Sequence, residues 1–120
     1  MANPQHIEWL LEGWEAWNAR REREKFRANF SSADLPALFE AAGLLTGSGR
    51  MKLPRVNLEG ADLRGTDLSG GANLSSADLR GADLRRANLE VAHLRWADLR
   101  GADLRAAYLK GADLGRAHLG

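Results

Sequence analysis

The chain has 120 residues, no cysteine and a formal net charge of +1, with 28% charged and 44% hydrophobic residues. The length fits one compact domain, and the absence of cysteine excludes disulfides and thiolate metal sites. A net charge of +1 is too small to indicate binding to nucleic acid. No apolar run reaches the length of a membrane span, and residues 1–27 are too charged for a signal peptide, so we expect a cytoplasmic protein.

A capping helix is predicted within residues 1–27. Asn3 can cap its amino end and Pro4 suits its first turn. The helix is expected to continue through the charged segment from Arg20 to Lys25. Apolar residues recur at helical spacing before that segment, at Ile7, Leu10, Leu11, Trp14 and Trp17.

Leucine recurs every fifth residue in the second half of the chain, and alanine stands two residues before most of these leucines. A step of five gives no single face on a helix and alternates faces on a flat strand, so neither element explains it. We therefore predict an all-β solenoid of very short strands with a bend after each unit. The leucines are Leu53, Leu58, Leu63, Leu68, Leu74, Leu79, Leu84, Leu89, Leu94, Leu99, Leu104, Leu109, Leu114 and Leu119.

A longer period of twenty residues sets the number of sides. Residues 77–85 and 97–105 have the same sequence, so four units make one coil and the cross-section is quadrilateral. One extra residue breaks the rhythm between Leu68 and Leu74. We interpret Gly71 as a bulge at a corner, because glycine tolerates positive φ. Successive coils should lie about 4.8 Å apart around a dry core of leucine and alanine.

The repeated A(D/N)LXX unit resembles the pentapeptide-repeat family. The resemblance covers residues 51–120 and extends back to two further units at 28–32 and 33–37, with Phe30 at the centre of the first. It implies a right-handed quadrilateral β-helix over residues 28–120, in which the central leucine and the small residue two positions before it point inward.

Residues 36–50 interrupt the first coil and are predicted to form a short helix, from Pro36 to Gly43, followed by a flexible loop. We expect apolar residues to cover the first coil, because an open end exposes core residues and unpaired strand edges. The helix stretch GWEAWNARRE is also similar to leader helices of some bacterial pentapeptide-repeat domains. Partner binding by this helix or by the loop is the alternative. The covering residues are Leu10, Trp14 and Trp17 of the helix, with Leu38, Phe39 and Leu44 of the interruption.

The carboxyl end has no comparable cover in the sequence. An open edge invites pairing, so we expect a two-fold homodimer through this end. A frayed final coil or a truncated chain is the alternative. The residues of this edge are Leu104, Leu109, Leu114 and Leu119.

Acidic and histidine residues do not predict a catalytic or metal site. The aspartates stand in an outward slot where asparagine alternates with them, and a carboxamide cannot act as acid, base or charged ligand. His6, His93 and His118 have no ligand-like spacing, and no nucleophile or phosphate-loop motif is present. A filled interior offers no pocket. We therefore expect no enzyme activity, no metal and no cofactor.

Arginines and aspartates stack when the chain is projected on the twenty-residue coil. We interpret these rows as mutual neutralisation of a solvated wall, with a basic strip for an acidic partner as the alternative. The interleaved aspartates argue against binding of duplex DNA. One row holds Arg64, Arg85 and Arg105 beside Asp62, Asp83 and Asp103, and another holds Arg80 and Arg100 beside Asp78 and Asp98.

Apolar residues in outward slots break the repeat pattern. Val91 and Trp96 lie at successive corners, and Tyr108 lies on the preceding face. Aromatic and arginine side chains are enriched at the centres of protein interfaces, so we predict a protein-contact patch. Isolated exposed apolar residues are the alternative. The patch comprises Val91, Arg95, Trp96, Tyr108 and Arg116.

The resemblance implies two classes of function. One is a scaffold for protein–protein interaction or assembly with an unidentified partner. The alternative is a DNA mimic that modulates or protects a type II topoisomerase such as DNA gyrase. Members of the second class are strongly acidic along the rod, whereas this chain carries arginines on its walls. The sequence therefore favours the scaffold, with an idle fragment of a larger protein as a third class.

Overall fold

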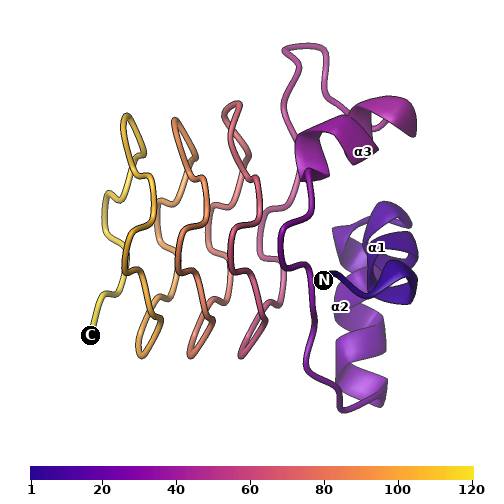
Figure 1. Ribbon diagram of the computed structural model, residues 1–120, viewed down its shortest axis with the longest axis horizontal. Helices are drawn as coiled ribbons and strands as arrows, with labels where there is room; N and C mark the ends of the chain where they lie inside the picture. Colours follow the sequence, from indigo (N-terminus) through magenta and orange to yellow (C-terminus); the bar gives the residue numbers. More distant parts are fainter.

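The computed structural model describes residues 1–120 and consists of a four-sided solenoid with helices at its amino-terminal end (Figure 1). The helices are α1 (Pro4–Leu11), α2 (Trp14–Arg23) and α3 (Leu35–Ala41). In Figure 1, α1 and α2 lie at one end of the solenoid, and the carboxyl terminus lies at the other end. None of the three helices has both the length and the apolar character needed to cross a bilayer.

Twelve parallel bridges between successive coils define four faces with three bridges each. The solenoid therefore has four coils, which we number from the amino end. Neighbouring coils pair through one residue per face, so the very short strands predicted from the sequence are single bridged residues. The bridged residues are Asn29, Asp62, Asp83 and Asp103 on the first face; Asp34, Asp67, Asn88 and Tyr108 on the second; Lys52, Asn73, His93 and Asp113 on the third; and Asn57, Asp78, Asp98 and His118 on the fourth.

Each unit repeats the same backbone hydrogen bonds. The amide of Leu63 donates to the carbonyl of Asp83 in the next coil at 2.8 Å, and the amide of Asp83 donates back to the carbonyl of Ala61 at 2.9 Å. The amide of Thr66 closes the corner by donating to the carbonyl of Leu63 at 3.1 Å. The backbone is thereby satisfied around a core of leucine and alanine columns that are fully buried in coils 2 and 3.

Two interruptions disturb the register, and both lie at the corner between the second and third faces. Residues bridged between coils 1 and 2 on the first two faces are 33 positions apart instead of 20, because α3 and its loop intervene. The partners are 21 positions apart where Gly71 lies between them and 20 apart after it. Gly70 and Gly71 have φ values of 82° and 80°, which glycine adopts without steric cost.

The amino-terminal segment forms two helices, so the single helix predicted there is wrong. The side chain of Asn3 caps α1 by accepting from the amide of Gln5 at 2.9 Å, as the sequence indicates. Gly13 then adopts a φ of 113° and separates α1 from α2. A residue with a Cβ rarely adopts this conformation, and the helical spacing of the apolar residues conceals the break.

Side chains of the helices make the hydrogen bonds that a preceding coil would make to coil 1. On the fourth face, the amide of Asn57 donates to Oδ1 of Asn18 at 2.7 Å, and its carbonyl accepts from Nε1 of Trp17 at 2.8 Å. On the first face, the amide of Asn29 donates to Nδ1 of His6 at 3.0 Å. The carbonyl of Asn29 accepts from the amide of Asn3 at 3.0 Å. Two faces of coil 1 therefore have partners on the side where no coil precedes them.

The apolar residues of the helices are buried against coil 1 to different extents. Trp17 is 0% exposed and its ring lies 5.4 Å from that of Phe30. Leu10 is also buried, whereas Trp14 is half-buried. His6 lies in the same cluster, with its ring 4.8 Å from that of Phe26. No role for His6 follows from the sequence, because its hydrogen bond to Asn29 and its contact with Phe26 join segments distant in the chain.

We expect protonation of His6 to destabilise the fold. Burial, with a smaller contribution from Arg21, lowers the pKa of His6 below its usual value of 6.5. The unfolded chain therefore binds more protons than the folded chain below pH 6.5, and stability should fall as the pH drops from there through the lowered pKa. Urea unfolding between neutral and acidic pH should show this loss, and His6→Gln should reduce it. An unchanged slope in His6→Gln would contradict the assignment, with His93→Gln as the control.

The interruption of coil 1 begins with α3. Oδ1 of Asp34 caps this helix by accepting from the amide of Ala37 at 3.1 Å. Phe39 is buried, but Leu44 is exposed, so the prediction that Leu44 covers the first coil is wrong. Gly43, with a φ of 70°, redirects the chain before Leu44, and the neighbouring Leu45 rather than Leu44 packs against the core.

Candidate functional site

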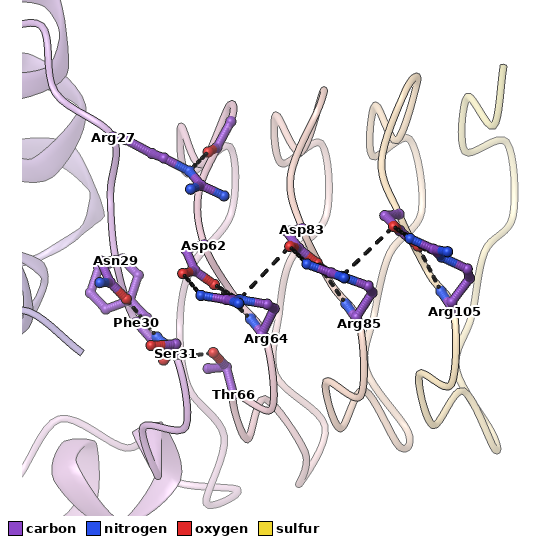
Figure 2. Close-up of polar contacts among 12 residues, drawn as sticks. Arg27, Asn29, Phe30, Ser31, Asp62, Arg64, Thr66, Asp83, Arg85 and Arg105 are labelled. Atoms are coloured by element: carbon purple, nitrogen blue, oxygen red, sulfur yellow. Dashed lines mark hydrogen bonds and ion pairs between the residues drawn. The ribbon is translucent and has the colours of Figure 1, made fainter. Parts of the chain in front are cut away.

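Side chains on the first face form an ion-pair ladder along the solenoid (Figure 2). Arg64 makes a bidentate contact with Asp62, at 2.7 Å from Nη2 to Oδ2 and 2.9 Å from Nε to Oδ1. Its Nε also lies 3.8 Å from Oδ2 of Asp83 in the next coil. Arg85 and Arg105 repeat the bidentate contact in coils 3 and 4.

The fourth face repeats this arrangement. Arg80 lies 2.7 Å from Asp78, 3.8 Å from Asp98 and 3.2 Å from Glu59. Arg100 lies 2.6 Å from Asp98. The predicted mutual neutralisation is therefore confirmed on both faces. These pairs are geometrically good but exposed, so each contributes little to stability.

We expect Asp103 to titrate well below an unpaired aspartate. The side-chain hydrogen bond from Arg105 lowers its pKa from 3.8 to about 2. Because the folded pKa is the lower one, the stabilisation is present above pH ~4 and is lost as the pH falls through about 2. Carboxyl-detected NMR should show this low transition, and Arg105→Gln should raise it. Arg86→Gln, which removes the same charge without breaking an ion pair, should leave it unchanged. A wild-type transition at the ordinary pKa would contradict this pairing.

The third face lacks the ladder. Two residues after each of its bridged residues, where Arg64, Arg85 and Arg105 lie on the first face, the third face has Pro54, Ser75, Arg95 and Gly115. Arg95 follows His93 rather than an aspartate. Its Nη1 lies 3.7 Å from Oδ2 of Asp113, without a bidentate contact.

Arg50, at the end of the loop that follows α3, reaches across the third face. The loop is closed by hydrogen bonds in both directions between Thr46 and Arg50, at 2.8 Å to the carbonyl of Arg50 and 3.1 Å to Oγ1 of Thr46. Nη1 of Arg50 lies 3.3 Å from Nε2 of His93, and the imidazole must accept because a guanidinium only donates. A Cβ on Gly71 would lie 3.0 Å from Nε of Arg50. The additional glycine therefore leaves the space that the Arg50 side chain occupies.

These residues line an open groove on the third face, which we call the basic groove. Its lining contains three cationic side chains and no carboxylate. Hydroxyl and amide groups of Thr46, Ser48, Asn73 and Ser75 supply further polar atoms. The charged and imidazole side chains of the basic groove are Arg50, Lys52, His93 and Arg95.

The two corners beside the third face carry large side chains. Trp96 lies at the following corner, is 54% exposed, and has the guanidinium carbon of Arg116 at 5.1 Å from its ring centroid. Val91 lies at the preceding corner and is equally exposed. Val91 and Trp96 have φ values of 60° and 64°, a region that favours glycine. Glycine occupies the corresponding corner position in several other units, including Gly65 and Gly81.

Val91→Gly is expected to stabilise the fold by about 1 kcal/mol, because positive φ costs residues with a Cβ roughly 1–2 kcal/mol. The exposed side chain offsets little of this cost by burial. Glu90→Gly is the matched control, since Glu90 precedes Val91 without positive φ and should lose about 0.5–1 kcal/mol. Urea unfolding measures both. A lower midpoint for Val91→Gly than for the wild type would contradict the argument.

The structure brings together only part of the predicted contact patch. Arg95, Trp96 and Arg116 lie on the third face and its following corner. Val91 lies at the opposite corner, and Tyr108 is exposed on the second face. Tyr108 is therefore not on the surface that Trp96 presents.

The predicted dimer edge is the outer side of coil 4. Among its inward-facing leucines, three are only half-buried and Leu119 is 61% exposed. The half-buried ones are Leu104, Leu109 and Leu114. The corresponding leucines of coils 2 and 3 are at most 2% exposed. The edge thus presents apolar side chains that coils 2 and 3 conceal.

Sequence reasoning missed the basic groove. Arg50 is remote from His93 in the chain, and the length of the interruption does not indicate where its loop returns. One signal was present: five of the six arginines in the slot after a repeat leucine follow an aspartate at the outward position, and only Arg95 follows a histidine. The structure contains no group of three or more histidine, cysteine or acidic side chains placed to hold a metal ion.

A family model described as pentapeptide repeats matches residues 50–70, 71–105 and 87–120, with 8 copies. The chain belongs to the pentapeptide-repeat family. Pentapeptide-repeat proteins form right-handed β-helices, so the predicted handedness is that of the family. They are generally structural or interaction proteins. A comparison with curated proteins found no match.

Several solved pentapeptide-repeat structures are similar to this chain. HetL from the cyanobacterium Nostoc sp. strain PCC 7120, described as involved in heterocyst differentiation regulation, is 36% identical with a TM-score of 0.53, covering 78% of this chain and 47% of HetL. Rfr23 from the cyanobacterium Cyanothece 51142 is 34% identical with a TM-score of 0.42, covering 59% and 57%. A protein of the Arabidopsis thaliana thylakoid lumen is 32% identical with a TM-score of 0.47, covering 74% and 59%. The chain thus spans 47–59% of the lengths of these proteins.

Proposed function

We propose that this pentapeptide-repeat chain is a non-enzymatic scaffold that binds a protein partner through the surface formed by Arg95, Trp96 and Arg116. The observation that carries the proposal is the placement of Trp96. A large aromatic side chain occupies a positive-φ corner, remains 54% exposed, and stacks with a guanidinium. Positive φ is common to the corners of this solenoid, so the exposure of a large aromatic side chain there, rather than the backbone conformation, marks the site.

The chemistry of this surface supports a protein partner. Tryptophan and arginine are the residues most enriched among those that dominate binding energy at protein interfaces. Arg95 adds a guanidinium that no bidentate partner occupies. The first and fourth faces offer no comparable surface, because their arginines are paired with aspartates.

Affinity capture from the organism that encodes the chain tests this proposal. Wild type and Tyr108→Ala should retain the same proteins, since Tyr108 is exposed on a different face. Trp96→Ala should lose at least one of them while keeping the wild-type circular dichroism spectrum and unfolding midpoint. Identical sets of captured proteins for wild type and Trp96→Ala would contradict the proposed contact surface.

We further propose that α1 and α2 cap the solenoid. The support is that Trp17, Asn18, His6 and the amide of Asn3 occupy the hydrogen-bonding positions that a preceding coil would fill. The free edge of coil 1 is thereby protected on two faces. Substitution of Trp17 by alanine tests this role, because a cap that contributes to stability loses its buried indole.

Self-association through coil 4 is a second proposed role. Its support is the exposure of Leu119 and the half-burial of the other three inward leucines. A second copy stacked on this edge would bury them. Light scattering should detect a dimer as the protein concentration rises, and a monomer at high concentration would contradict the proposal.

The DNA-mimic alternative lacks support in the charge distribution. A mimic of duplex DNA needs uncompensated carboxylates along the rod. The aspartates of coils 2 to 4 on the first face each carry an arginine, as do Asp78 and Asp98 on the fourth, and the third face is basic. We therefore do not extend that function to this chain.

A further inference from the structure

We infer that the basic groove of the third face binds an extended acidic segment of the partner protein, with carboxylates held by Arg50 and Arg95. This inference rests on the proposed scaffold function and names the chemistry of the partner. It concerns a surface beside Trp96, so the two can fail separately.

Positive charge is concentrated in the basic groove although the whole chain has a net charge of only +1. The groove lining has three cations and no carboxylate, and Asp113 is the only acidic residue on the third face. The neighbouring second face carries carboxylates at Asp34, Asp67 and Glu90, with Lys110 as its cation. A groove of one sign between less positive walls focuses its potential on a ligand of opposite charge.

The arginines of the basic groove have unused hydrogen-bonding capacity. Arginines of the ladders lie 2.6–2.9 Å from both oxygens of an aspartate, as in Arg85 with Asp83. Arg95 instead has a single carboxylate oxygen at 3.7 Å and is half-exposed. Arg50 donates to the imidazole of His93, which carries no negative charge. Each guanidinium can therefore take a carboxylate in the bidentate geometry that gives strong charge-assisted hydrogen bonds.

The position of Arg50 is fixed before any ligand binds. Thr46 closes the loop on the backbone of Arg50, and the guanidinium contacts His93 two coils away. Gly71 is the residue beneath the side chain, where a Cβ would force it aside. The 36–50 interruption and the additional glycine therefore both lie in contact with Arg50 and help to position its side chain. Ordering it in advance reduces the entropy that binding must offset.

The length of the basic groove suits a short extended peptide. Lys52 lies in coil 1, and Arg95 extends from coil 3 toward Asp113 in coil 4. The residues that line the groove lie in coils 1 to 3, and two coil steps of about 4.8 Å span roughly 10 Å, the length of about three residues of an extended chain.

An acidic peptide fits these observations better than a nucleic acid. A duplex would bring its phosphates over the carboxylates of the second face as well as over the groove. Single strands are bound by rows of aromatic side chains on which successive bases stack, and the groove lining contains no phenylalanine, tyrosine or tryptophan. A narrow basic strip between the acidic second face and the neutralised fourth face instead matches one peptide chain.

Fluorescence anisotropy of the full chain tests the inference with a fluorescein-labelled glutamate-rich peptide of about eight residues, which is longer than the stretch that the groove accommodates. The same peptide with glutamine in place of glutamate is the neutral probe. Arg50→Gln with Arg95→Gln should weaken binding of the acidic peptide about tenfold, because two charge-assisted contacts are lost. Arg80→Gln with Arg100→Gln removes the same charge from the fourth face and should leave the affinity within about twofold of wild type at 0.15 M salt, where distant charges are screened. Urea midpoints verify that both double variants fold.

Three results would overturn the inference. The first is equal binding of the acidic and neutral peptides. The second is an equal loss of affinity in the two double variants. The third is tighter binding of a single-stranded oligonucleotide than of the acidic peptide, lost with Arg50→Gln and Arg95→Gln, which would assign the groove to nucleic acid. If capture still depends on Trp96 in any of these cases, the scaffold function stands and only the acidic segment is rejected.

Discussion

Trp17→Ala is expected to lower the free energy of unfolding by about 3–5 kcal/mol, as for large aromatic residues removed from a core. The indole of Trp17 is 0% exposed and packs against Phe30 of coil 1. Its loss also leaves the carbonyl of Asn57 without its donor. An unsatisfied carbonyl at the edge of the solenoid adds to the cost of the cavity.

Two further tryptophans provide matched controls for this substitution. Trp14→Ala in the same helix should cost less, because Trp14 is half-buried. Trp96→Ala should change stability by no more than about 0.5 kcal/mol, as for exposed positions in general. Urea unfolding followed by circular dichroism measures all three. A Trp17→Ala midpoint equal to that of Trp96→Ala would show that the helices do not cap the solenoid.

Leu89→Ala should have an effect of similar size, about 2–5 kcal/mol. Leu89 is fully buried in coil 3, with the core closed by coils 2 and 4 on its two sides. Leu109 lies one coil later in the same column and is half-buried, so Leu109→Ala should cost less, about 1–2 kcal/mol. The two substitutions compare two positions of the same leucine column, one inside the solenoid and one at its edge.

Protein concentration separates the explanations for Leu109. If a second copy covers coil 4, the cost of Leu109→Ala should rise toward that of Leu89→Ala as the concentration increases. A smaller cost that is independent of concentration would contradict the proposed self-association. Equal costs in the dilute monomer would contradict the partial burial of Leu109.

The repeating part of the fold could be predicted because every unit has the same pattern of inward-facing and outward-facing residues. Leucine every fifth residue fixes which side chain points inward, and a change of register would expose it. The twenty-residue identity then places Arg85 beneath Arg105, so the ion-pair ladder of the first face also follows from the sequence. Because the units repeat, residues about twenty positions apart in the chain lie one coil apart along the solenoid.

The unique segments could not be predicted in the same way. Gly13 divides the amino-terminal helix although the apolar spacing continues across it. Leu44 faces solvent because Gly43 redirects the chain. The contact between Arg50 and His93 depends on where a loop returns, which no local pattern specifies. These features depend on tertiary contacts that occur at one place in the chain and do not repeat from coil to coil.

The corner between the second and third faces tolerates changes in length that the rest of the solenoid does not contain. Bridged partners across it are 33 residues apart in one coil and 21 in the next, yet the stacking continues without a gap. Foreign peptide sequences could therefore be grafted at this corner, between Leu44 and Arg50, without altering the stacking of the coils. Such grafts would replace the Thr46 contacts that hold Arg50 and would project beside Val91, so the same frame could display new recognition elements in place of the basic groove.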